Sequence, residues 1–100
     1  MGQFTVSIQY LGLLRNTVGR SEEEISAPQG VLVEDVLRLL GEKHGEQFTS
    51  VVFRSDGRLR ALTQVVVDGN DIRDGEGLKT KLKGGDKISV IVGIYPISGG

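Results

Sequence analysis

The sequence predicts a single α+β domain, in which a mixed sheet of four to five strands packs on one main helix. Its length of 100 residues is typical of one domain with one hydrophobic core. Segments near both ends of the chain alternate apolar and polar residues, as half-buried strands do. Between them, one segment repeats its apolar residues at the spacing of an amphipathic helix.

The first predicted strand covers residues 3–10, where the apolar residues on one face are Phe4, Val6, Ile8 and Tyr10. The pairs Arg15-Asn16 and Gly19-Arg20 interrupt the pattern, and residues 21–27 return as a second, antiparallel strand. The glutamates of this strand, Glu22 to Glu24, suit an exposed edge, because charge there discourages pairing with another chain.

A helix is predicted over residues 33–44. Its apolar residues recur at helical spacing: Val33, Val36, Leu37 and Leu40. Acidic residues stand in the first turn and Lys43-His44 in the last, which matches the helix dipole at both ends. Gly45 then stands where a left-handed cap is expected.

Three more strands are predicted after the helix. The first is the short apolar run Val51-Val52-Phe53, the second covers residues 63–67, and the last covers residues 87–92 after the turn Gly84-Gly85-Asp86. The predicted elements are a hairpin, a crossover helix and further strands. The helix has one apolar face to bury, so the strands should form a single sheet that it covers. The β-grasp arrangement is the simplest solution, and it places the last strand beside the first in the centre of the sheet. The two periodicities select a core of Phe4, Val6, Ile8, Val36, Leu37, Leu40, Val67, Ile88 and Val90.

The composition excludes several classes of function. The chain has no cysteine, which rules out disulfides, thiolate metal sites and cysteine nucleophiles. Its formal net charge of -1 gives no field that attracts nucleic acid or anionic membranes. No stretch has the length of a bilayer span or the pattern of a secretory signal. We therefore expect a soluble, cytoplasmic protein with no nucleic-acid or membrane partner, and with no bound metal or cofactor.

The motifs that suggest an enzyme are weak. His44 is the only histidine, and its position predicts a solvated cation at a helix end. Gly75-Glu76-Gly77 resembles the start of a dinucleotide-binding fingerprint, but the third glycine and the following helix are missing. The basic run of Lys79, Lys81 and Lys83 lacks interleaved aromatic residues, so we interpret it as a solvated face.

The end of the sequence is more informative. We expect a domain over residues 1–93 and an extended tail over residues 94–100, Ile-Tyr-Pro-Ile-Ser-Gly-Gly. Pro96 prevents helix formation, and glycine at the end lets the backbone pass through a narrow channel. From Gly93 onward the chain reaches at most roughly 26 Å, enough to enter another protein's active site. The residues expected to contact a partner are Pro96, Ile97, Ser98 and Gly99.

The carboxylate of Gly100 is the candidate reactive group. A free carboxylate is inert, but activation with ATP as an acyl-adenylate opens it to attack by sulfur or by an amine. The alternative is a passive binding module, in which the sheet contacts a partner and the tail is incidental. That alternative predicts that the terminus tolerates extension.

Several segments, taken in this order, resemble the ThiS/MoaD sulfur carriers, ubiquitin-like proteins of thiamin and molybdopterin biosynthesis. Within that family the chain looks most similar to the small subunit of molybdopterin synthase. The resemblance covers nearly the whole chain. Besides the opening strand, it is carried by Leu14-Arg15, Ser21-Glu22-Glu23-Glu24, Asp35-Val36-Leu37, Asp56-Gly57-Arg58-Leu59-Arg60, Val67-Asp68-Gly69-Asn70-Asp71-Ile72-Arg73, Leu82-Lys83-Gly84-Gly85-Asp86-Lys87-Ile88 and Ser98-Gly99-Gly100.

The resemblance implies a β-grasp carrier protein, not a complete enzyme. An activating enzyme of the ubiquitin-activating type would use ATP to adenylate Gly100, which would then become a thiocarboxylate. The tail would enter the large subunit of molybdopterin synthase or another sulfur acceptor. One departure from the family is that Gly93-Ile94-Tyr95 adds length before a single Pro96. Ubiquitin-like modifiers share the fold and the ending, and they transfer the activated glycine to lysines of target proteins.

Overall fold

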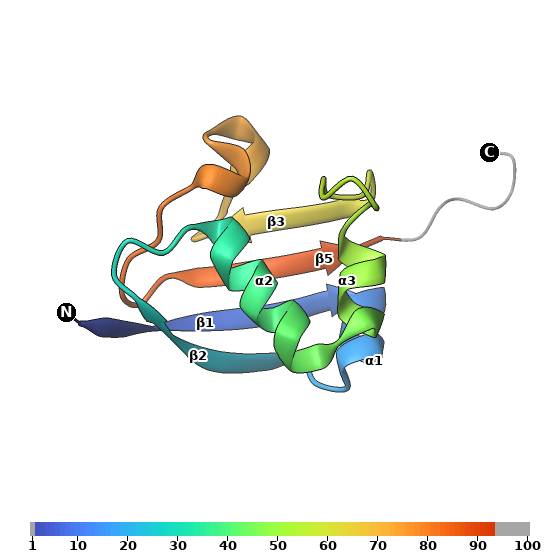
Figure 1. The fold of residues 1–100 in the computed structure, drawn as a ribbon, viewed down its shortest axis with the longest axis horizontal. Helices are drawn as coiled ribbons and strands as arrows, with labels where there is room; N and C mark the ends of the chain where they lie inside the picture. Colours follow the sequence, from blue (N-terminus) through green and yellow to red (C-terminus); the bar gives the residue numbers. More distant parts are fainter. Residues whose placement is uncertain (1, 94–100) are drawn as a thin grey trace, which may run out of the picture.

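The structure, a computed structural model, describes residues 2–93. Its centre is a five-stranded mixed sheet with the strand order β2-β1-β5-β3-β4 (Figure 1). The central strands β1 and β5 are parallel, and the other neighbouring pairs are antiparallel. The last strand therefore lies beside the first, as predicted. The strands are β1 Gln3–Gly12, β2 Glu22–Pro28, β3 Thr63–Val67, β4 Asn70–Asp71 and β5 Lys87–Val92.

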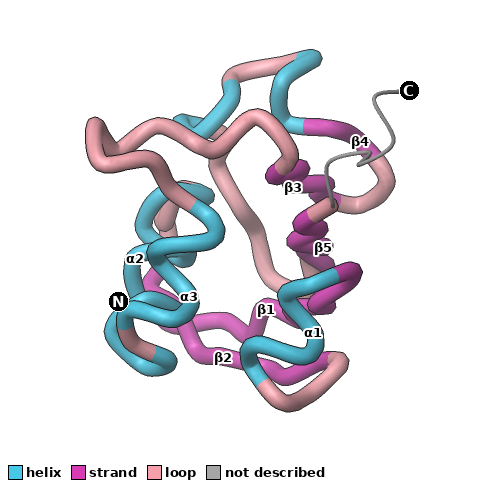
Figure 2. Tube along the Cα trace, turned by 90° about the vertical axis from the view of Figure 1, so that its right-hand side faces the viewer, coloured by secondary structure: helices cyan, strands magenta, loops and turns pink. Residues whose placement is uncertain are grey.

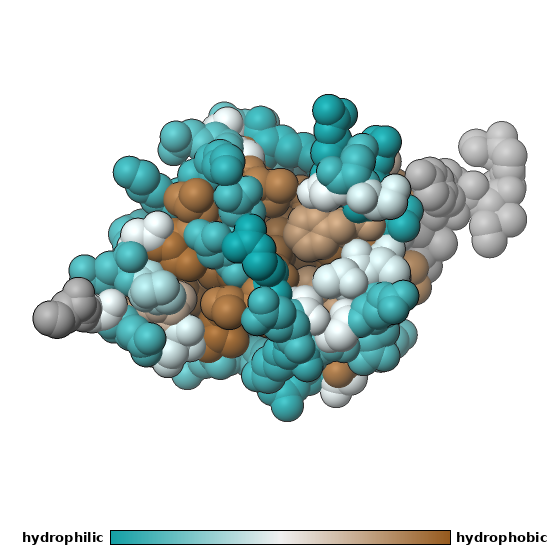
Figure 3. All heavy atoms as spheres, in the orientation of Figure 1, coloured by the Kyte–Doolittle hydropathy of each residue, from teal (hydrophilic) through white to brown (hydrophobic). Residues whose placement is uncertain are grey.

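Helices α2 and α3 lie on the same face of the sheet, and α1 lies at the end of the sheet where β1 finishes (Figure 2). None of the helices in residues 2–93 is long and apolar enough to span a membrane. On the α2 face, hydrophobic side chains lie between hydrophilic ones without forming one continuous patch (Figure 3). The helices are α1 Leu13–Val18, α2 Val33–His44 and α3 Glu46–Val52, with short 3-10 turns at Ile72–Asp74 and Gly77–Lys79.

The core forms between the sheet and these helices. Of the nine residues predicted to form it, seven are buried: Val6, Ile8, Val36, Leu37, Leu40, Ile88 and Val90. Phe4 and Val67 are only partly buried against the core, because each lies near the end of its strand. Tyr10 and Phe48 are the largest fully buried side chains. Strand alternation and helical spacing therefore located seven of the 18 buried hydrophobic residues in the described part of the chain, on β1, α2 and β5.

Helix α2 has the predicted bounds, and the side chain of Asp35 explains its start. The carboxylate of Asp35 accepts a hydrogen bond from the backbone N–H of Leu32 at 2.9 Å, which satisfies one of the free donors at the helix N-terminus. The predicted left-handed cap at Gly45 is wrong, because Gly45 has φ 83° and ψ -165°. Its N–H still donates to the carbonyl of Gly41 at 2.8 Å.

The strand predicted at Val51-Val52-Phe53 is wrong, because Val51 and Val52 end helix α3. Phe48 and Val52 stand four residues apart and are both fully buried, so they form the apolar side of this helix. Only Phe53 has extended backbone, and it forms a single antiparallel bridge with Leu59. Tertiary burial of one face thus outweighs the strand preference of adjacent valines.

Helix α1 is not among the predicted elements, because the residues between the first two strands indicated only an interruption of the strand pattern. Leu14 is fully buried and Val18, four residues later, packs against the core. Gly19 closes the helix in the left-handed conformation, with φ 86° and ψ 14°, and its N–H donates to the carbonyl of Arg15. A helix of six residues contains too few turns to show a clear period.

Replacing Leu37 by alanine tests the packing of α2 on the sheet. Leu37 is fully buried, so Leu37→Ala should lower the free energy of unfolding by about 2 to 5 kcal/mol. Leu39 lies on the same helix but is 40% exposed, and Leu39→Ala should change that free energy by less than about 0.5 kcal/mol. Urea denaturation measures both; similar losses would contradict the assigned faces of α2.

Candidate functional site

The predicted reactive and partner-binding residues Gly100, Gly99, Ser98, Ile97 and Pro96 lie outside the described residues. The structure does describe the point from which the tail begins, here called the tail root. Strand β5 ends at Val92, and the N–H of Gly93 donates to the carbonyl of Leu62 at 3.0 Å. This bond is the last one described before residue 94.

Gly12 is the main residue of the tail root that sequence reasoning missed. It ends β1 and is in register with Val92 of β5. It has φ 66°, and a Cβ atom at this position would lie 2.2 Å from the carbonyl oxygen of Val92. A glycine within a strand signals such a close backbone approach, but only the parallel pairing of β1 and β5 identifies the partner. Gly12 thus permits the backbones of β1 and β5 to approach closely at the tail root.

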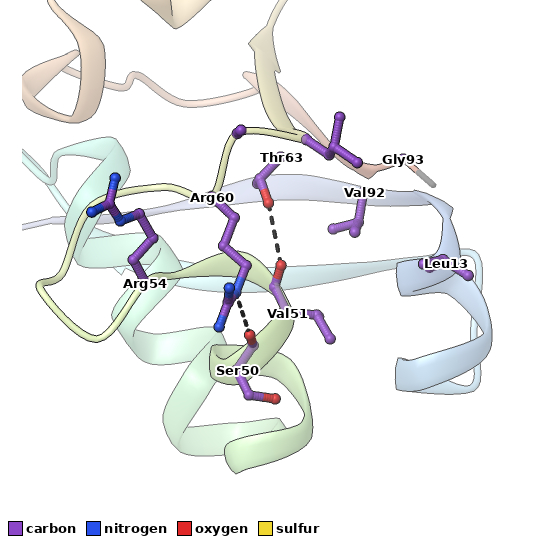
Figure 4. A pocket seen from close by; sticks show the side chains of 10 residues that line it. Leu13, Ser50, Val51, Arg54, Arg60, Thr63, Val92 and Gly93 are labelled. Carbon is purple, nitrogen blue, oxygen red and sulfur yellow. Dashed lines mark hydrogen bonds between the residues drawn. The ribbon is translucent and has the colours of Figure 1, made fainter. Parts of the chain in front are cut away.

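A groove of about 690 Å³ opens beside the tail root. Leu13 from α1, Val51 from α3 and Val92 from β5 border the same space (Figure 4). Leu62 and Gly93 complete the wall next to the tail. Leu13 is 41% exposed, so a large apolar side chain is accessible where the tail begins. The groove therefore offers an apolar binding surface beside Gly93, the last described residue.

Arginine side chains stand at the rim of the groove. The Arg60 Nε donates to the carbonyl of Ser50 at 2.6 Å, and Arg54 pairs with Asp56 at 3.1 Å. The residues that line the groove include these two arginines but no carboxylate and no histidine. The groove is therefore suited to binding and lacks the usual side chains of acid–base catalysis.

His44 is not the solvated helix-end cation that the sequence predicted. Its side chain is only 12% exposed, and its Nε2 lies 2.6 Å from Glu23 Oε2. The same carboxylate accepts hydrogen bonds from the Tyr10 hydroxyl and from Lys43 Nζ, each at 2.5 Å. The expectation of an exposed glutamate run is therefore wrong for Glu23, whose side chain is 2% exposed. This cluster joins β2 to β1 and to the end of α2.

The cluster keeps Glu23 ionised. Burial by itself would raise the pKa of its carboxyl, but hydrogen bonds from Lys43, Tyr10 and His44 outweigh that effect and lower the pKa to about 2. Burial, followed by the hydrogen bond to Glu23, raises the pKa of the Tyr10 hydroxyl. The partners of Glu23 therefore form a structural network rather than a nucleophile and base facing a substrate.

The remaining sequence motifs show no catalytic arrangement in the described part of the chain. Lys79 pairs with Glu34 at 2.8 Å and Lys83 with Asp86 at 3.2 Å, in keeping with a solvated charged face. Gly75-Glu76-Gly77 lies between two 3-10 turns, with no long helix after it. Within residues 2–93, no group of three His, Asp or Glu side chains is placed to hold a metal ion.

Residues 8–100 match the model of the ThiS family. An Archaeoglobus fulgidus protein, provisionally named a sulfur carrier protein, is 28% identical over 75 residues, which are 75% of this chain and 83% of that protein. The solution structure of small archaeal modifier protein 1 from Methanosarcina acetivorans is 29% identical, with TM-score 0.79 and coverage of 100% of both chains. A Pyrococcus furiosus protein, provisionally named subunit 1 of a molybdopterin converting factor, is 26% identical with TM-score 0.72, covering 91% of this chain and 99% of that one. These structures confirm the predicted ubiquitin-like β-grasp fold.

Substituting Gly12 tests the close approach at the tail root, and Gly19 provides a matched control. Both glycines have positive φ, but a Cβ at Gly19 meets no atom within 4 Å. Gly19→Ala should therefore cost only the left-handed backbone penalty, about 1 to 2 kcal/mol. Gly12→Ala should cost about 1 to 3 kcal/mol more, because the methyl group clashes with Val92 and because ψ -141° places Gly12 outside the αL region that Gly19 occupies. Denaturation curves measure the difference, and equal costs would contradict the clash.

The Glu23 cluster predicts a specific loss of stability in acid. The folded-state pKa of Glu23, about 2, lies below its ordinary value of 4.5. Its ionisation therefore contributes stability on the order of 3 kcal/mol, complete above about pH 4.5 and lost as the pH falls toward 2.

Denaturant titrations between pH 6 and pH 2 check this expectation. Glu23→Gln should remove this part of the acid-induced decline in unfolding free energy, whereas Glu24→Gln, at an exposed position of the same strand, should retain it. Parallel pH profiles for the wild-type chain and Glu23→Gln would show that the network does not hold Glu23 ionised.

Proposed function

The chain belongs to the ThiS family, and we propose that it is a sulfur carrier whose Gly100 carboxylate is converted to a thiocarboxylate. The observation that carries this proposal is the position of the Gly-Gly ending relative to the fold. The sheet holds the chain up to Gly93 through the bond to Leu62, and the sequence then runs seven residues to Gly100. The family match also extends through Gly100.

The proposed chemistry needs two steps. A Gly100 carboxylate oxygen attacks the α-phosphorus of ATP in an activating enzyme of the ubiquitin-activating type, and pyrophosphate leaves. A sulfur donor at the oxidation level of sulfide then attacks the acyl carbon, AMP leaves, and the thiocarboxylate forms. ATP is used by the activating enzyme, so the carrier itself needs no bound cofactor.

The proposed sulfur acceptor is the large subunit of a molybdopterin synthase. The name of the Pyrococcus furiosus relative supports this choice over other acceptors. In this proposal Pro96, Ile97, Ser98 and Gly99 lie in a channel of the acceptor and bring the sulfur on Gly100 to a pterin precursor. The acceptor's own residues perform the catalysis.

A second candidate is a protein modifier, which the similarity to the Methanosarcina acetivorans modifier supports. The activation step is the same. A lysine amine of a target protein then attacks the acyl carbon, AMP leaves, and an isopeptide bond forms to Gly100. Carrier and modifier therefore differ only in the nucleophile that follows adenylation.

Mass spectrometry of the intact chain tests the shared activation. After incubation with ATP, the activating enzyme of the same cell and a sulfide-level donor, the mass should rise by the difference between one sulfur and one oxygen atom. Deleting Gly100, or appending one residue after it, should abolish this change. Both variants should unfold at the wild-type urea concentration, because their changes lie outside the core.

The fate of the activated chain separates the two candidates. A carrier returns with its carboxylate restored after the acceptor is added, whereas a modifier leaves a Gly-Gly remnant on a target lysine after proteolysis. If the intact chain forms neither adenylate nor thiocarboxylate, and the extended chain supports normal growth, the carboxylate is not the working group.

A further inference from the structure

We propose that the groove at the tail root docks the activating enzyme, which fills it with an apolar side chain flanked by carboxylates. This inference rests on the proposed function, since it names a second contact for the protein that receives the tail. It differs from the proposed function in that it concerns described residues of the domain and not Gly100.

The apolar part of the proposal comes from Leu13. Only Leu13 and Leu39 are exposed large hydrophobic residues in the described part of the chain, at 41% and 40%. Single exposed leucines are common on protein surfaces. Leu13, however, borders a groove whose other apolar walls are Val51, Leu62 and Val92. A side chain that enters this groove removes apolar surface from water on several sides at once.

The charged part of the proposal comes from the arginines at the rim. The bond from Arg60 Nε to the Ser50 carbonyl holds one guanidinium beside the groove. Arg54 adds a second guanidinium, which already pairs with Asp56 at 3.1 Å, so Arg60 carries the rim charge that is left for an occupant. Carboxylates on the occupant complement this rim and form charge-assisted hydrogen bonds with guanidinium groups.

The position of Gly93 identifies the occupant as the enzyme that takes the tail. Gly93 lines the groove, and residue 94 follows it directly. A protein that encloses residues 94–100 therefore lies against this groove. The chain's own residues 94–100 are the competing occupant, and their removal distinguishes the two in the binding experiment below.

The test compares Leu13→Ser with Leu39→Ser, since the two leucines have nearly equal exposure on different helices. Leu13→Ser should raise the KM of the activating enzyme for the chain by about tenfold, with thiocarboxylate formation at saturation unchanged. Leu39→Ser should leave KM within about twofold. Leu13→Met, which keeps an apolar side chain, should restore the wild-type value.

Two arginine variants test the charged rim of the groove. Arg60→Gln should raise KM and weaken its dependence on salt, whereas Arg38→Gln on α2 should alter neither. Urea denaturation of each variant shows that the fold persists. Equal effects of the Leu13 and Leu39 variants, or of the two arginine variants, would overturn the docking site even if the thiocarboxylate forms normally.

A binding measurement separates failure of the docking site from failure of the proposed function. Full chains with Gly100 deleted, with and without Leu13→Ser, are titrated into the activating enzyme without ATP. A weaker affinity for the Leu13→Ser chain supports docking whatever the fate of Gly100. If the chain without Gly100 does not bind the activating enzyme at all, the docking proposal is wrong. Two results would assign the groove to another occupant. If the free chain forms a dimer that Leu13→Ser dissociates, the occupant is a second copy of the chain. If the amide signals of Leu13 and Val51 shift when residues 94–100 are removed, the occupant is the chain's own tail.

Discussion

The parallel pairing of β1 with β5 is the constraint on which the rest of the structure depends. It joins residues near the start of the chain to residues near its end, with Ser7 opposite Lys87 and Gly12 opposite Val92. Parallel neighbours cannot be joined by a tight turn, so the intervening chain must cross over the sheet. Helices α2 and α3 lie on that path and cover the face that carries the core. The same pairing brings the end of β5 next to α1 and so creates the tail root.

The Glu23 cluster shows how the fold tolerates a charge in its interior. A buried carboxylate is costly unless it is paired and hydrogen-bonded. Glu23 receives contacts from β1, through Tyr10, and from the end of α2, through Lys43 and His44. Because these partners come from different elements, the carboxylate ties the edge strand β2 to both layers. The strand remains an edge, with Glu22 and Glu24 exposed on either side of the buried carboxylate.

The architecture separates stability from the proposed chemistry. Core residues such as Ile8, Leu37 and Val90 are fully buried, whereas the proposed reactive residue Gly100 lies outside the described residues. The proposed reactive group is a backbone carboxylate that needs no side-chain catalyst from this chain. What the domain supplies is an exit point for the tail, held by the Gly93–Leu62 bond, and an apolar groove beside it. In the proposed function, catalysis belongs to the partner proteins and recognition belongs to the surface of this domain.

The sequence alone determined the strands at both ends, the bounds of α2 and the part of the core that these elements carry, because their apolar periods are long and regular. The Gly-Gly ending supplied the candidate at Gly100. The comparisons confirm the family, and the role of Gly100 stays a prediction. The short helices α1 and α3 could not be predicted, because each has only one pair of core residues at helical spacing. These pairs are Leu14 with Val18 and Phe48 with Val52. One pair does not establish a helical period, and only packing against the rest of the core shows which face is buried. The network around Glu23 and the groove between Leu13, Val51 and Val92 each combine residues far apart in sequence. Only tertiary packing decides which of these residues meet, because no local period relates them.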